Sequence, residues 1–102
     1  RNFGASTMPA DPRLLKRWEI LERLLSEAGE QIIGSEQHSW LKEYIEYNEF
    51  GLALDVLDEA GAACQVNAEY WRLLKKAAEV MGDERRKAFQ RKFQQARIAA
   101  AP

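Results

Sequence analysis

The stretch VNAEYWRLLKKAAEVMG, residues 66–82, carries the clearest helical pattern in the chain. Asn67 can cap a helix whose apolar residues recur every three or four positions, and Gly82 supplies a stop. Val66 and Trp71 are placed to form a hydrophobic staple across the cap. The spacing therefore predicts one amphipathic helix from residue 68 to residue 81.

Two further helices are indicated before this stretch, each with its own start signal. Asp11 followed by proline can cap the first, which should stop near Gly29. Ser35 can cap the second, which should break near Asn48. The predicted buried stripe of that second helix is Trp40, Leu41, Tyr44 and Ile45.

A third apolar repeat runs from Phe50 to Cys64, with Gly61 inside it as either an early end or a close packing contact. Asp83 can cap a last helix with a narrow seam of phenylalanines. No segment alternates apolar and polar residues between hairpin turns, so we assign no strand. The sequence predicts an all-α fold, a compact bundle or orthogonal array of about five helices.

Length and composition fit one domain in an ordinary globular class. The 102 residues leave no room for a second core, so residues 11–102 are predicted to form a single helical domain. Residues 1–10 are expected to be a flexible tail. Met8 is a candidate for the natural first residue, in which case residues 1–7 would not belong to the natural protein. The chain has no apolar run of about 20 residues and no secretory signal, so we expect a cytoplasmic protein.

Charge is unevenly distributed, although the formal total is only −1. From residue 83 onward basic residues dominate, whereas the middle of the chain is acidic. Between residues 36 and 69 the chain has a single lysine, Lys42, and eight acidic residues: Glu36, Glu43, Glu46, Glu49, Asp55, Asp58, Glu59 and Glu69. Such a distribution is typical either of solvated helix faces or of a patch that steers a basic partner.

Helical phase turns these carboxylates away from the predicted apolar stripes, and therefore toward water. Whether the two acidic helices share one surface stays open at this point. Our candidate partner-binding residues are Glu43, Glu46, Tyr47, Glu49, Asp55, Asp58 and Glu59, with Glu36 at the margin.

Residues that could carry out a reaction are not expected. His38 is the single histidine and Cys64 the single cysteine, so one chain can build neither a histidine triad nor a cysteine-based zinc site. No phosphate-binding glycine loop or nucleophile-elbow serine occurs. We therefore predict a binding protein without catalytic, cofactor or metal residues.

Nucleic-acid binding is the main rival hypothesis, because the last helix is basic and amphipathic. Its basic residues accompany Phe89 and Phe93 and are Arg85, Arg86, Lys87, Arg91, Lys92 and Arg97. Against this, a polyanion would be repelled by the acidic middle, and the isoelectric point is near 5.9. A helical adaptor or assembly subunit is the third hypothesis.

One stretch resembles a known family. EYNEFGLALDVLDE at residues 46–59, VNAEY at 66–70, Leu73-Leu74 and Val80-Met81-Gly82 are similar to MafI-type immunity proteins of bacterial polymorphic and contact-dependent toxin systems. The likeness covers about Trp40 to Gly82. Where such proteins often carry a Leu-Tyr-Glu-type segment after the Ala-Leu helix, this chain has AGAA at residues 60–63.

The resemblance implies a cytosolic protein that binds and neutralises a toxin domain delivered by a neighbouring cell, often a nuclease. A nuclease that handles phosphate presents a basic groove, and an acidic helical surface would meet it with fast, salt-sensitive association. The expected partner is therefore a basic toxin domain. Neither a membrane nor a nucleic acid is expected as a partner.

Overall fold

The computed structural model describes residues 11–101, and this part of the chain forms five α-helices and one short 3-10 turn without any strand. The predicted all-α fold is confirmed. The predicted tail at residues 1–10 lies outside the described residues. The elements are α1 (Pro12–Gly29), η2 (Glu30–Ile32), α2 (Glu36–Glu46), α3 (Phe50–Ala63), α4 (Ala68–Met81) and α5 (Arg86–Ala100).

Side-chain caps start three of the helices at the predicted residues. The Asp11 carboxylate accepts the backbone N–H of Arg13, and the Asn67 amide oxygen accepts that of Tyr70 at 3.1 Å. The Ser35 hydroxyl accepts the backbone N–H of His38, in the first turn of α2, at 3.3 Å. Each cap satisfies an N–H that has no partner inside the helix, which is why these short polar residues fix the starts.

The helix ends follow the glycine signals less uniformly. Gly82 ends α4 in the left-handed conformation, at φ 71°, as predicted. Gly29 remains right-handed, and the chain continues into η2 before turning at Gly34, at φ 94°. Gly61 does not end α3, because the helix continues to Ala63. Of the two interpretations of Gly61, the structure supports the close packing contact, which is made with Trp71 and Tyr70 of α4.

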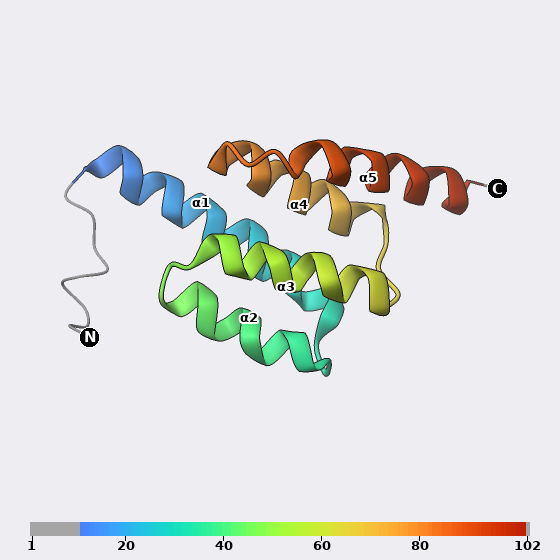
Figure 1. Ribbon diagram of the computed structural model, residues 1–102, viewed down its shortest axis with the longest axis horizontal. Helices are drawn as coiled ribbons and strands as arrows, with labels where there is room; N and C mark the ends of the chain where they lie inside the picture. Colours follow the sequence, from blue (N-terminus) through green and yellow to red (C-terminus); the bar gives the residue numbers. More distant parts are fainter. Residues whose placement is uncertain (1–10, 102) are drawn as a thin grey trace.

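Figure 1 shows α4 and α5 side by side along one edge of the molecule, with α2 at the opposite edge and α3 in front of α1. The central helix is α1, which contacts α2, α3 and α4. α2 packs on α3, whereas α5 packs mainly on α4 and its last turn projects beyond the other helices. Within the described residues, no helix is long and apolar enough to cross a membrane.

Three aromatic rings from α4 and α5 lie together in the core. Tyr70 and Trp71 meet edge to face at 5.2 Å between ring centroids, and Trp71 stacks on Phe89 at 6.2 Å. The Tyr70 hydroxyl donates a 2.5 Å hydrogen bond to the carbonyl oxygen of Leu57 in α3. The phenol is therefore buried with its polar atom satisfied, and it ties α4 to α3.

Alkaline pH should destabilise the protein through Tyr70. Burial, together with the nearby Cys64 and Asp58, raises the pKa of this phenol above its ordinary value of about 10. As the pH rises, Tyr70 would therefore lose its proton in the unfolded chain at a lower pH than in the folded protein. The free energy of unfolding should therefore stay level below about pH 10 and fall above it, by at most about 1.4 kcal/mol per pH unit from this group.

Urea unfolding of the wild type and of Tyr70→Phe between pH 8 and pH 11 would measure this effect. The variant should be less stable by about 1 kcal/mol at pH 8, because the Leu57 carbonyl loses its donor, and should show a flatter decline above pH 10. Tyr44→Phe, which removes a half-buried phenol outside the core centre, serves as the control. An equally steep decline in Tyr70→Phe would contradict the assignment.

Candidate protein-binding surface on the α2–α3 hairpin

The two acidic helices form an antiparallel hairpin, so their outer sides lie next to each other. The connecting turn places Asn48 in the left-handed region at φ 59°, which asparagine tolerates better than most residues. At the far end the Gln37 amide donates a 2.9 Å hydrogen bond to Glu59. Because both helices rise about 1.5 Å per residue, this bond sets Trp40 level with Val56, and Tyr44 level with Leu52.

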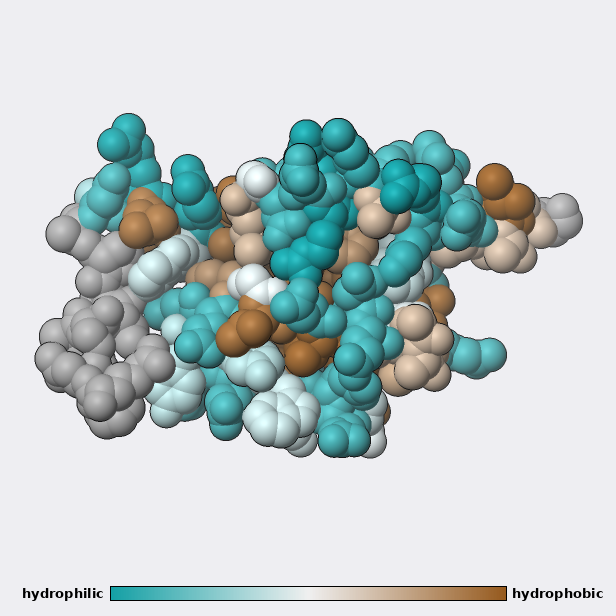
Figure 2. Space-filling view, viewed as in Figure 1, coloured by the Kyte–Doolittle hydropathy of each residue, from teal (hydrophilic) through white to brown (hydrophobic). Residues whose placement is uncertain are grey.

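Apolar and aromatic side chains occupy the middle of this outer side. Trp40 is 48% exposed and stacks on Tyr44 at 6.2 Å between ring centroids, and Leu52 is 45% exposed. Val56 is half-buried beside them. Figure 2 shows hydrophobic side chains gathered between α3 and α2, with paler ones over α2.

Four carboxylates border these apolar residues. Glu36, Trp40 and Glu43 follow one another at helical spacing along α2, and Asp55 and Glu59 lie on the outer side of α3. All four acidic residues are exposed. We call this surface the hairpin face and define it by its apolar and acidic residues: Trp40, Tyr44, Leu52, Val56, Glu36, Glu43, Asp55 and Glu59.

The exposure of Trp40 differs from the sequence prediction, which placed it in the buried stripe of α2. That stripe, from Trp40 round to Ile45, spans about 140° of the helix circumference at 100° per residue. Only Leu41 in its middle is fully buried, against α1. Trp40 lies at the edge of the stripe away from α1, so its ring remains half in solvent.

Two predicted site residues on α3 already have cationic partners inside the protein. The Arg85 guanidinium, at the start of α5, bonds Asp55 and also Asp83 at 2.8 Å, and it lowers the pKa of Asp83. Lys92 bonds Asp58 at 2.6 Å and lies 4.7 Å from the centre of the Trp71 ring. A basic partner would have to compete with α5 for these two carboxylates.

The other predicted residues fall in different places. Glu43 and Glu59 belong to the hairpin face, whereas Glu46 is exposed on the side of α2 that adjoins α1. Tyr47 and Glu49 are half-buried in the turn, where the backbone N–H of Glu49 bonds the carbonyl oxygen of Tyr44 at 2.8 Å. The structure thus gathers some of the candidates on one face and separates the rest.

The basic residues of α5, on which the nucleic-acid hypothesis depends, are partly used within the fold. Arg85 and Lys92 pair with α3, as described above. Lys87, Arg91 and Arg97 are exposed along the helix. Two of the six cations on which the nucleic-acid hypothesis depends therefore neutralise the acidic side of α3.

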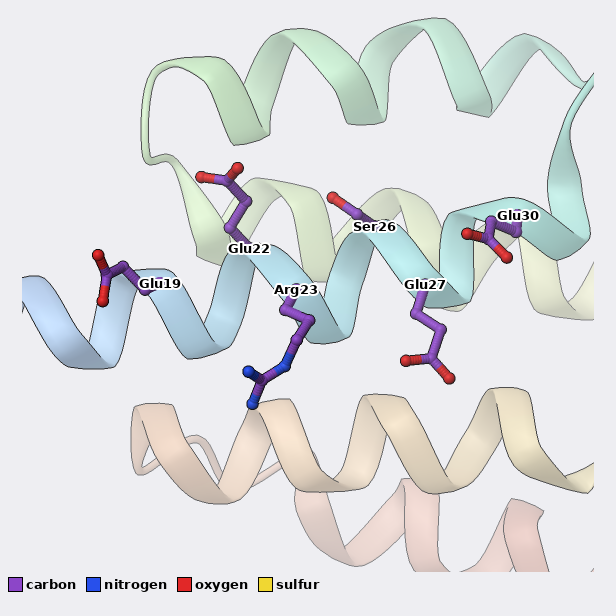
Figure 3. Close-up of a pocket in the computed structure, with 6 residues that line it drawn as sticks. All are labelled: Glu19, Glu22, Arg23, Ser26, Glu27 and Glu30. Atoms are coloured by element: carbon purple, nitrogen blue, oxygen red, sulfur yellow. The ribbon is translucent and has the colours of Figure 1, made fainter.

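A second acidic surface, on α1, was missed by the sequence analysis. Figure 3 shows Glu22 and Ser26 on the side of α1 toward α2, and Arg23 and Glu27 on the side toward α4. The first half of α1 is basic, so counting charge along the helix hid the acids of its second half. Helical phase could have found two of them, because Glu19 and Glu27 lie on the side of α1 opposite its buried residues.

Comparison of the chain with protein-family models, with curated proteins and with solved structures found no match. Among the described residues, no group of three histidine, cysteine, aspartate or glutamate side chains could hold a metal ion. The candidate site is therefore described by its own chemistry, which is a half-exposed aromatic pair bordered by carboxylates.

Proposed function

We propose that this protein binds a basic protein partner through the hairpin face and inhibits it. The observation that carries the proposal is Trp40, which is half exposed, stacked on Tyr44 and bordered by the carboxylates of Glu36 and Glu43. Tryptophan and tyrosine dominate the energetic centres of protein interfaces, and surrounding charges select the partner and speed association. The combination supports docking of a positively charged surface.

The resemblance over about Trp40 to Gly82 suggests the kind of partner. The hairpin face lies largely within that stretch, and MafI-type immunity proteins neutralise toxin domains. The proposed activity is accordingly that of an immunity protein: stoichiometric binding of a toxin domain, such as a nuclease with a basic groove, in the cytoplasm. A partner that binds nucleic acid must itself present positive charge, which the acidic border of the face would attract.

Protection of cells is the direct test. The protein and the toxin domain encoded in the neighbouring reading frame should be co-expressed, and growth should be restored only when both are present. The purified pair should form a one-to-one complex whose association slows as salt is raised. Absence of protection, with the toxin active and this protein expressed, would contradict the immunity function.

Replacing Trp40 by alanine should weaken the complex about 30-fold, equivalent to about 2 kcal/mol, because the aromatic centre of the interface is lost. Titration calorimetry would measure the affinity, and thermal unfolding would show whether the fold is retained. Ile98→Ala is the matched control, since Ile98 is 76% exposed on α5, away from the hairpin. Equal affinities for wild type and Trp40→Ala would remove the hairpin face from consideration.

A further inference from the structure

An apolar groove lies between α1 and α2, on the side of α2 away from the hairpin face. It encloses about 450 Å³ and is lined by Ser26 of α1 and by Leu41, Ile45, His38, Lys42 and Glu46 of α2. Leu41 is buried and Ile45 half-buried, so the floor is aliphatic and the polar groups form the rim. Ser26 also lines the acidic hollow on α1, so the two hollows are neighbours that share this residue.

The carboxylates beside the groove differ from those of α3 in having no internal cation. Glu19, Glu22, Glu30 and Glu46 form no side-chain hydrogen bond or ion pair with any described residue, whereas Asp55 and Asp58 are paired with α5. Arg23 and Lys42 are the basic residues of the two linings. A cation arriving here would meet negative charge without displacing a competitor, unlike a cation arriving at Asp55 or Asp58.

We infer that this groove binds a lysine- or arginine-containing peptide segment of a partner protein, with one apolar side chain seated over Leu41 and Ile45. The charge around the groove selects basic residues, and its aliphatic floor selects the apolar one. The inference deepens the proposed function and rests on it in one respect: the segment belongs to the same basic partner that meets the hairpin face. The partner would then contact α2 on two sides, at the hairpin face and at the groove beside α1.

Helix geometry sets the spacing of the segment. Glu22 lies four residues before Ser26 in α1, and Glu30, the first residue of η2, lies four residues after it, so each is about 6 Å from Ser26 along the helix direction. An extended peptide rises about 3.3 Å per residue, so cations two positions before and two after the apolar side chain reach these two carboxylates. The matching pattern is basic, any, apolar, any, basic.

A synthetic peptide tests this without any knowledge of the partner. Acetyl-KKLKK-amide would be titrated into the full-length ¹⁵N-labelled protein and followed by NMR. We expect the largest shifts at Ser26, Leu41 and Ile45, and about tenfold weaker binding in the double variant Glu22→Gln/Glu30→Gln, since each exposed charge contributes up to about threefold. The matched control is Asp55→Asn/Glu59→Gln, which alters the hairpin face and should leave peptide affinity unchanged.

The composition of the peptide separates the groove from nonspecific attraction. Acetyl-KKSKK-amide keeps the charge and lacks the apolar anchor, so it should bind several-fold more weakly. Equal affinity of the two peptides would overturn the inference, as would shifts confined to α3 or no shifts at millimolar peptide. The titration needs no toxin, so its outcome is independent of the tests of the proposed function. Peptide binding can be absent while protection and the Trp40→Ala effect are observed, and peptide binding can be observed while protection is absent.

Discussion

Replacing Phe89 by alanine is expected to destabilise the protein by about 3–5 kcal/mol, the usual cost of deleting a buried phenylalanine ring. Within α5, all of whose residues are described, Phe89 alone is buried, and its ring stacks on Trp71. The remaining links of α5 to the body include the exposed or half-exposed ion pairs of Arg85 and Lys92. Ion pairs with that much solvent contact contribute little each, so the ring supplies most of the attachment.

Urea unfolding would give the loss of stability, and hydrogen exchange would show where it acts. Amides of α5 should exchange much faster in Phe89→Ala than in the wild type, since this helix packs mainly on α4. Phe93→Ala removes a half-buried ring from the same helix and should cost clearly less. Similar losses for the two variants would contradict the idea that one side chain anchors α5.

Two glycines of α3 should respond to alanine in opposite directions. A Cβ placed at Gly61 would lie only 2.7 Å from Cζ2 of Trp71 and 2.8 Å from Cε2 of Tyr70. Both rings are buried in the core, so moving either one would disturb the close packing around it. We therefore expect Gly61→Ala to destabilise the protein by about 3 kcal/mol, the upper end of the range for overpacking, despite the better helix propensity of alanine.

Gly51 has open space around it, because a Cβ there would meet nothing within 4 Å. Gly51→Ala should stabilise the protein by up to about 1 kcal/mol, since alanine lowers the entropy that the unfolded chain loses on forming a helix. Thermal unfolding of both variants gives the two signs in one experiment. A stabilised Gly61→Ala would show that the α3–α4 contact is looser than the geometry indicates.

Sequence reasoning predicted the local structure well because its signals act over a few residues. Asn67 and Ser35 each cap a helix with a bond to the third residue on, and Gly82 adopts its left-handed conformation within a single turn. The outward direction of Glu43, Asp55 and Glu59 likewise follows from helix phase alone. These features need no knowledge of how the helices pack.

The sequence by itself thus determined the helical class, the caps that begin α1, α2 and α4, and the side of α2 and α3 that carries charge. Only the tertiary structure decided which charges remain available, because the pairing of Asp55 with Arg85 and of Asp58 with Lys92 joins residues 30 and 34 positions apart. It also decided that Trp40 lies at the edge of the core, and that α1 and α2 enclose a groove. Both depend on the angle and register at which helices pack, which hydrophobic periodicity leaves unspecified.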